Sequence, residues 1–404
     1  MSKREPHFAG HAVLTPYRSH FMIERSDENR TAFLEGVKLM DELIREVEVS
    51  EILSNTVKMI RPLDREAMAK AQARQDVLTK PQGSLGRLEE LAVQLAGIQG
   101  KPIPQIRHKA IITMAGDHGV VAEKVGNWPQ EVTAQMVYNF LGGGAGINVV
   151  ARQVGARVVV VDMGVATELK SSPGLLSRKV AAGTQNMARG PAMTEEQAVR
   201  SIETGIEIVA AEAAKGLDIV GIGDMGIGNT TPSAAICSLI SGKPAAEVTG
   251  RGTGLTDEQL AHKVGVVEQA IRLNHPDPKQ PLDVLAKVGG FEIGGLAGVM
   301  LGAAVRRIPV VIDGFISGAA ALIATALAPQ LKDYLLAAHL SAEVGHRVML
   351  DHMGLKPLLN LEMRLGEGTG AALGIFLAET SARILAEMST FAEAGVSERN
   401  EPSN

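Results

Sequence analysis

Short apolar runs alternate with longer helical patterns from residue 108 onward, and this alternation limits the fold more than any other feature of the chain. Runs of this length are typical of strands that are buried on both faces, and helices between them make consecutive strands parallel. We therefore predict an α/β fold with a mainly parallel sheet and helices on both faces. The predicted strands are Ala110–Met114, Arg157–Val161, Asp218–Ile222, Ile308–Ile312 and Tyr334–Ala338.

Small and polar residues follow every predicted strand. They are Gly116–Gly119, Asp162–Gly164, Gly223–Gly226, Asp313–Gly314 and His339–Ser341. Ligands of open α/β sheets bind beyond the carboxyl ends of the strands. We therefore expect all five strand ends to line one crevice.

The chain before the sheet has a different pattern. Residues 1–30 are polar and unpatterned, which predicts a disordered leader. Apolar residues then recur at helical spacing from Phe33 to Val47, and further helices are expected to begin at Asp64 and after Ser84. Residues 31–107 are thus predicted to be helical and 108–374 to hold the sheet, and the residues from Ser397 are expected to form a solvated tail.

Composition excludes several classes of protein. The net charge is -5 with acidic and basic residues interspersed, so we expect no nucleic-acid partner and no anionic membrane surface. No apolar run is long enough to span a bilayer, and no apolar signal segment is recognised near the start. The single cysteine, Cys237, fits a reducing compartment and an inert place in the core. These features predict a cytoplasmic protein.

The segment from Gly221 to Pro232 carries two competing interpretations. Gly221, Gly223 and Gly226 formally match a dinucleotide-binding fingerprint, in which the helix opens among the glycines. Here the glycines continue to Gly228, so we expect Thr231 to cap the following helix and Pro232 to be its first residue. A longer loop of free backbone N–H groups would suit a phosphomonoester better than a dinucleotide. A tight turn that merely needs glycine is the third possibility.

Two more glycine-rich loops are Gly250–Gly254 and Gly366–Gly370, and the second places Glu367 between glycines. One interpretation is a carboxylate presented to a ligand that approaches the backbone closely. The other is a cap for a helix that begins around Ala371. The residues alone leave both open.

Histidines elsewhere give no metal motif. His339, Glu343 and His346 are spaced so that they could share one helical face, yet no cysteine or zinc pattern accompanies them. Hydrogen bonding within the protein is the preferred interpretation, and no metal is predicted. The segment Lys80–Glu89 is expected to be a turn followed by a capped helix.

Taken together, several segments resemble one family, the nicotinate-nucleotide:dimethylbenzimidazole phosphoribosyltransferases of cobalamin lower-ligand synthesis. The resemblance runs from about Pro62 to Val396. This chain departs from the family pattern at Asp224, where glutamate is usual, and in its first 50 residues, which have no counterpart. The similar segments are KPQGSLGRLE (80–89), AGDHGV (115–120), PQEVTAQMV (129–137), GIGDMGIGNTTP (221–232), GRGTGL (250–255), KVGGFEIGGLAGVMLGAA (287–304), PVVIDGFIS (309–317) and RLGEGTGAAL (364–373).

The resemblance implies a Rossmann-like catalytic domain and a small helical domain, in which residues 31–107 are joined by about 375–396, working as a homodimer. It implies transfer of phosphoribose from nicotinate mononucleotide to 5,6-dimethylbenzimidazole, which gives α-ribazole 5′-phosphate and nicotinate. The leaving ring is already a pyridinium, so one general base suffices and no cofactor or metal is expected.

The resemblance also assigns roles to residues. Glu367 is expected to be the general base, with Asp224 beside the reacting ring. The residues expected at the base pocket are Trp128, Met136, Met225 and Leu365. The residues expected around the phosphate and nucleotide are Gly226, Ile227, Gly228, Asn229, Thr230, Thr231, Lys263, Ser317, Gly366 and Gly368.

Two alternative functions stay open at this point. The glycine pattern at Gly221 would also fit a dinucleotide-dependent oxidoreductase. Asp224 in place of glutamate would fit a relative that binds an azole or nucleotide without turnover.

Overall fold

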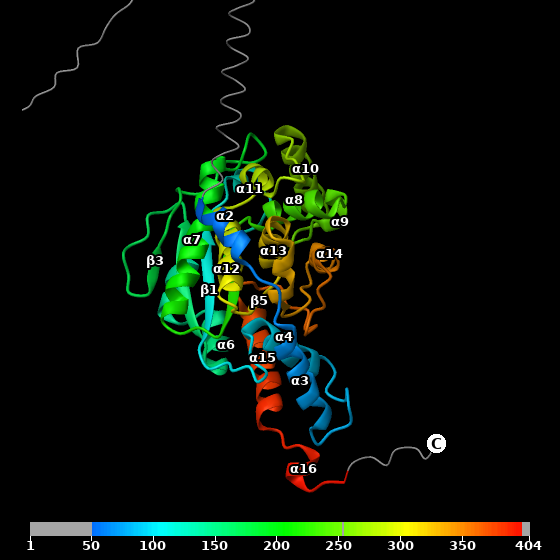
Figure 1. The fold of residues 1–404 in the computed structure, drawn as a ribbon. Coiled ribbons are helices and arrows are strands. Elements are labelled where there is room, and N and C mark those ends of the chain that lie inside the picture. Colours follow the sequence, from blue (N-terminus) through cyan, green and yellow to red (C-terminus); the bar gives the residue numbers. More distant parts are fainter. Residues whose placement is uncertain (1–50, 253, 398–404) are drawn as a thin grey trace, which may run out of the picture. The chain divides into compact units, whose positions relative to one another are not determined.

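The structure is a computed structural model that describes residues 51–252 and 254–397 (Figure 1). The predicted leader, the predicted helix over 33–47 and the tail from residue 398 lie outside the described residues. None of the helices within the described ranges is long and apolar enough to cross a membrane.

A six-stranded, fully parallel sheet forms the centre of the described chain, in the order β3-β2-β1-β4-β5-β6. All five predicted strands are confirmed. Strand β3 was not predicted, because three residues at the sheet edge are too few to show a pattern. The strands are β1 Lys109–Gly116, β2 Arg157–Gly164, β3 Leu175–Ser177, β4 Ile219–Met225, β5 Val310–Ile312 and β6 Leu335–Ala337.

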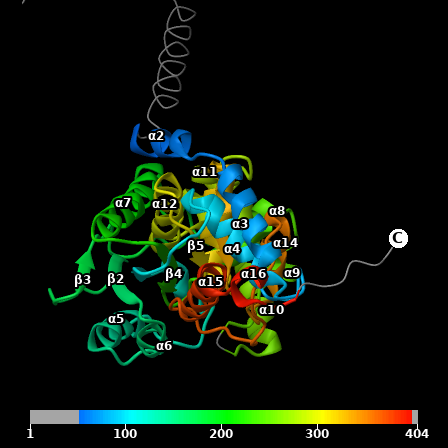
Figure 2. The same cartoon turned by 60° about the horizontal axis from the view of Figure 1, so that its bottom comes forward.

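Alternate side chains of the strands enter two separate hydrophobic clusters, one on each face. Ile112 and Val220 point to the face covered by α7 (Glu195–Ala214), α8 (Thr230–Ser241), α11 (Pro281–Val288), α12 (Phe291–Val305) and α13 (Phe315–Leu327). Ile111 and Ile219 point to the face covered by α4 (Arg87–Gln99), α5 (Val132–Gly142), α6 (Gly146–Val154) and α15 (Thr369–Glu387). Figure 2 shows α7 and α12 on one side of the sheet and α5 and α6 on the other. The predicted α/β architecture is confirmed.

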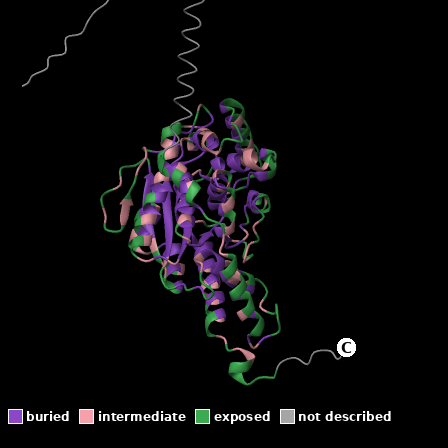
Figure 3. Cartoon of the chain, in the orientation of Figure 1, coloured by how far each residue is buried: buried purple, intermediate pink, exposed green. Residues whose placement is uncertain are grey.

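Helix α12 is buried almost throughout, and glycine allows α7 to approach it closely (Figure 3). A Cβ atom at Gly205 of α7 would lie 1.9 Å from the carbonyl oxygen of Gly295, and one at Gly298 would lie 1.9 Å from that of Ile202. Part of the high glycine content therefore serves backbone-to-backbone packing of these two helices.

Helix α3 (Arg65–Val77) begins as predicted, because the Asp64 carboxylate accepts the Ala67 N–H at 2.9 Å. Helix α4 begins at Arg87 rather than directly after Ser84, since Gly83 and Gly86 hold positive φ angles in the preceding turns. Alanines of α3 and α4 pack against Leu385 near the end of α15, so segments from both ends of the chain lie side by side (Figure 1).

The remaining elements are short or peripheral. They are α2 Glu51–Met59, η1 Gly119–Glu123, α9 Ala245–Val248, α10 Asp257–Asn274, η2 Pro329–Tyr334, α14 Val344–Met353 and α16 Phe391–Ala394.

Candidate active site

A cavity of about 390 Å³ opens beyond the carboxyl ends of β4, β5 and β6. The expectation that five strand ends line one crevice is wrong for β1 and β2. The Asp162 carboxylate instead accepts the N–H groups of Gly164 and Val165 in its own turn, and that of Asp117 accepts the Ala166 N–H. These side chains are used to hold loops together and do not line the cavity.

The glycines of the fingerprint-like pattern serve packing. Gly221 and Gly223 lie within strand β4, and a Cβ atom at Gly223 would meet the carbonyl oxygen of Glu367 at 2.2 Å. Glycine in the strand therefore lets the loop before α15 lie directly against it. Only Gly226 belongs to the loop that follows, so the geometry of a dinucleotide fingerprint is not formed.

Helix α8 starts at Thr230 with Asn229 as its N-cap, so the prediction of Thr231 as cap and Pro232 as first residue is wrong by two residues. Asn229 has no capping hydrogen bond, because its side-chain amide donates to Asp224 Oδ2 at 2.9 Å. Thr231 is fully buried in the helix.

The prediction that this loop presents free backbone N–H groups is also partly wrong. The Ile227 N–H donates to Thr133 Oγ1 at 3.1 Å, and the N–H groups of Asn229 and Thr231 donate to carbonyl groups of the same loop. Cationic side chains supply the charge instead.

Lys263 and Arg251 line a smaller cavity of about 80 Å³. This cavity and the larger one share Trp128, Gly226, Ile227, Asn229, Thr230 and Gly252. Lys263 Nζ lies 2.7 Å from Thr230 Oγ1 and 3.3 Å from the Gly250 carbonyl oxygen. Burial lowers the pKa of Lys263 to about 8, although the Glu343 carboxylate acts in the opposite direction. A phosphate group fits this end by charge.

Glu367 stands in the wall of the large cavity with its backbone in the left-handed region, at φ 65°. Four groups fix it. Its N–H donates to the Asp224 carbonyl, its carbonyl accepts from Thr113 Oγ1, and its Oε2 accepts the Ile147 N–H at 3.1 Å. Asp313, at the end of β5, accepts the N–H groups of the following residues Gly368 and Ala371.

Glu367 does not cap the helix that follows it, as one interpretation of the sequence expected. Helix α15 begins at Thr369 with Gly368 as N-cap, whereas the Glu367 carboxylate bonds near the start of α6. Burial, helped by the Asp313 carboxylate, raises the pKa of Glu367. A raised pKa strengthens a carboxylate as a base.

Asp224 lies beside Glu367 at the carboxyl end of β4 and is 7% exposed. Burial raises its pKa to about 8, and the neighbouring carboxylates of Asp313, Glu292 and Glu367 act in the same direction. The floor of the cavity is thus rich in carboxyl groups, a surrounding that favours a cationic ligand.

All four residues predicted at the base pocket, Trp128, Met136, Met225 and Leu365, line the large cavity. Trp128 is 51% exposed and Leu365 60% exposed, which places them at its mouth. Gly366 also lines it, but Gly368, Thr231 and Ser317 line neither cavity. Ser317 is buried within α13, and the Gly368 N–H is bound to Asp313.

Several lining residues were not predicted as site residues, although most follow strand ends that the sequence identified. His339, Glu343 and His346 do not share a helical face, since only His346 lies within α14. His339 and Glu343 line the cavity, and His346 accepts the Ser341 N–H behind it. The unpredicted residues that line the large cavity are Val132, Gly252, Gly314, Phe315, Ile316, His339, Ser341, Glu343 and Arg364. Those that line only the smaller cavity are Val125, Gly126, Asn127, Arg251 and Leu255.

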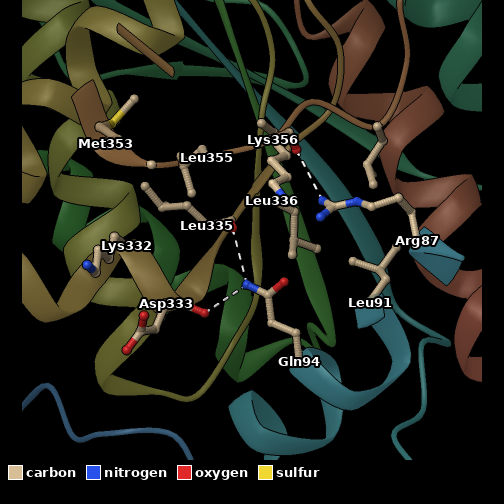
Figure 4. A pocket seen from close by; sticks show the side chains of 13 residues that line it. Arg87, Leu91, Gln94, Lys332, Asp333, Leu335, Leu336, Met353, Leu355 and Lys356 are labelled. Carbon is tan, nitrogen blue, oxygen red and sulfur yellow. Dashed lines mark hydrogen bonds between the residues drawn. The ribbon is translucent and has the colours of Figure 1, made fainter. Parts of the chain in front are cut away.

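A further cavity of about 390 Å³ lies along the outer edge of β6, and none of the predicted site residues lines it (Figure 4). Gln94 of α4 reaches across it and donates to the carbonyl oxygens of Asp333 and Leu335 at 3.0 and 3.3 Å. Arg87 donates to the Lys356 carbonyl at 3.2 Å. Among the residues that the structure describes, no group of three metal-ligating side chains could hold a metal ion.

The parallel α/β fold, with basic side chains in a small cavity beside an apolar cavity that has carboxyl groups in its wall, is typical of an enzyme that acts on a charged small molecule. The phosphoribosyltransferase family model matches residues 60–396. The chain is 62% identical over 349 residues to the nicotinate-nucleotide–dimethylbenzimidazole phosphoribosyltransferase of Dehalococcoides mccartyi strain CBDB1, covering 86% of this chain and 99% of that one.

It is 60% identical over 348 residues to the enzyme of the same name from Desulforudis audaxviator, covering 86% of this chain and 99% of that one. The crystal structure of the Thermus thermophilus nicotinate-nucleotide–dimethylbenzimidazole phosphoribosyltransferase superposes with a TM-score of 0.79 at 48% identity, covering 83% of this chain and all of that one. The chain belongs to the nicotinate-nucleotide–dimethylbenzimidazole phosphoribosyltransferase family.

Proposed function

We propose that the protein transfers phosphoribose from nicotinate mononucleotide to 5,6-dimethylbenzimidazole, releasing nicotinate and α-ribazole 5′-phosphate. The observation that carries the proposal is the continuity of two cavities, one with Lys263 and Arg251 and the other with Glu367 and Asp224 in its wall. A nucleotide can place its phosphate at the first and its reacting carbon at the second. The names of the relatives support the same substrates.

In the proposed reaction the bond between the ribose C1′ and the pyridinium nitrogen breaks, and its electron pair neutralises the leaving ring. A benzimidazole nitrogen bonds to C1′ from the opposite face, which inverts the β linkage to α. The other ring nitrogen gives its proton to the Glu367 carboxylate. Binding of the cationic donor lowers the raised pKa of Asp224, so that its carboxylate ionises and stabilises the positive charge that develops at C1′.

The test is release of nicotinate, measured by chromatography. Release should require a benzimidazole and should continue with a metal chelator present. A dependence on a nicotinamide dinucleotide would favour the oxidoreductase alternative, and binding of both substrates without product would favour the carrier alternative.

We further propose a homodimer in the cytoplasm. Tyr138 of α5, Val149 of α6 and Phe376 of α15 are 40%, 56% and 54% exposed on neighbouring helices, which supports a covered apolar face. The single cysteine is buried, and burial raises its thiol pKa to about 12, which fits a reducing compartment. Light scattering of the purified chain and fractionation of cells test the two statements.

A further inference from the structure

A buried histidine–glutamate pair lies behind the candidate active site. His118 follows strand β1 and Glu292 lies in the first turn of α12, and they are 1% and 0% exposed. His118 Nε2 and Glu292 Oε1 are 2.6 Å apart. Neither residue lines either of the two cavities. The pair therefore has no direct access to a ligand in them.

Three glycines close around this pair. A Cβ atom at Gly226 would lie 3.3 Å from both His118 Nε2 and Glu292 Oε1. At Gly116 it would lie 2.8 Å from Glu292 Oε2, and at Gly290 2.4 Å from His118 Cε1. The ends of β1 and β4 and the start of α12 thus converge on the pair. A change in its size or position is transmitted directly to Gly226, two residues beyond Asp224.

The pair also bears on the charge of the cavity floor. Burial lowers the pKa of His118, but the carboxylates that face it, Glu292, Asp117 and Asp224, outweigh burial and raise it. The groups that face Asp224 are Asp313, Glu292 and Glu367, with the Asn229 amide as a donor. The pair therefore lies among the carboxyl groups that surround Asp224.

We propose that His118 and Glu292 are positioning residues that hold the loop at Gly226 from beneath and so fix the place of Asp224, although they lie outside the cavity. This proposal rests on the proposed function. The pair contacts the loop directly and lines neither cavity.

The test compares His118→Gln and Glu292→Gln with Glu212→Gln. Glu212 is a matched control because it is also a buried glutamate in an ion pair, with Arg157, and lines neither cavity. Per folded molecule, each variant of the pair should lose at least ~10-fold in kcat beyond the control, because small displacements of reacting groups cost as much as about 10²-fold. The melting temperature of every variant is measured as well, because a loss of activity that comes only from unfolding lowers the melting temperature.

The pH profile supplies a readout that a structural role would not move. Displacement of the loop changes the surroundings of Asp224, so the pH limb that disappears in Asp224→Asn should shift in His118→Gln. In the Asp224→Asn background, His118→Gln should cost no more than Glu212→Gln. The proposal would be overturned if the losses in kcat equalled those of the control within twofold. It would also be overturned if the limb of the pH profile did not move, or if the losses in the double variant were additive.

Binding can be followed even without turnover. Trp128 is the single tryptophan and lines both cavities, so its fluorescence reports nicotinate mononucleotide binding as a function of pH. If the wild-type protein releases no nicotinate, the proposed function fails, while the shift of this binding profile in His118→Gln still decides the role of the pair.

Discussion

The backbone N–H of Glu367 donates to the carbonyl oxygen of Asp224 at 3.2 Å. This bond joins the loop before α15 to the end of β4, so both carboxyl groups belong to one wall of the cavity. A side-chain substitution leaves the bond intact, because only backbone atoms make it. Charge and shape at the two positions can therefore be varied separately from their placement.

Glu367→Gln should lower kcat by about 10²–10⁴, the usual contribution of a positioned general base. The amide oxygen of glutamine can still accept the Ile147 N–H, so the start of α6 keeps its partner. The KM for nicotinate mononucleotide should change little, because Lys263 and Arg251 are at the other cavity. Steady-state kinetics and melting temperature are measured together. A variant that is less stable yet fully active would contradict the catalytic role and show that Glu367 only stabilises the start of α6.

Asp224→Glu should retain activity within about tenfold, whereas Asp224→Asn should lose roughly 10- to 100-fold, because a carboxyl group can ionise when the cationic donor lowers its pKa and an amide cannot. Kinetics with nicotinate mononucleotide at several fixed benzimidazole concentrations measure both. If Asp224→Glu instead restored turnover from near zero, native turnover by this chain would be the wrong assignment.

Asp224→Asn should also be more stable than the wild type. The folded pKa of about 8 lies above the ordinary value of 3.8, so the stability tied to protonation is complete below pH 3.8 and is lost as pH rises through 8. The advantage of asparagine should therefore grow between these pH values and then level off, reaching at least ~1 kcal/mol, since one pKa unit corresponds to about 1.4 kcal/mol. Denaturant unfolding at pH 5, 7 and 9 checks the trend; a constant difference contradicts it.

Lys263→Ala should raise the KM for nicotinate mononucleotide by about 10- to 100-fold, the range for loss of a hydrogen bond to a charged group. In the wild type the KM should rise above pH 8, because the ammonium group with its lowered pKa loses its charge there. Lys263→Arg should remove this rise, since guanidinium stays protonated. Lys287→Ala, at an ion pair with Asp283 in α11, is the control. A wild-type KM independent of pH from 7 to 9.5 would argue against phosphate binding by Lys263.

Gly223→Ala should lower kcat by at least about 10²-fold without touching substrate. Its Cβ would meet the Glu367 carbonyl oxygen at 2.2 Å and displace the loop that carries the carboxylate. Gly265→Ala in α10 is the matched control, because its Cβ would meet nothing within 4 Å and helical alanine is favoured by up to about 1 kcal/mol. Equal activity of the two variants would show that the loop adapts.

The strands and the two-sided burial were predictable because apolar spacing records which faces are covered. The start of α8 was not, because the Asn229 side-chain amide donates to Asp224, five residues earlier, and the Asn229 side chain makes no capping hydrogen bond. Capping preferences do not include such a competing bond to a buried side chain. The carboxylates of Asp117 and Asp162 are likewise bonded to backbone N–H groups of turns and do not line the cavity.

Glu367 could be singled out from the sequence because a carboxylate between two glycines is unusual, and this pattern lies in adjacent residues. The reason for Gly221 and Gly223 could not be predicted, since it depends on segments more than 100 residues away. Gly221 faces Ile111 and helix α15, and Gly223 faces the loop before that helix. His339 and Glu343 were noticed as a spacing but assigned to one helix, whereas the chain between them turns and only the second caps α14.

The contacts across the cavity beside β6 also protect the edge of the sheet from pairing with another chain. The carbonyl groups of Leu335 and Ala337 belong to the last strand, and that of Asp333 precedes the strand. Gln94 donates to Asp333 and Leu335, and the Leu358 N–H donates to Ala337. A sheet edge with free carbonyl groups is a template for pairing with another chain. The Gln94 side chain and the Leu358 backbone thus take the place of a seventh strand and close the edge to intermolecular addition.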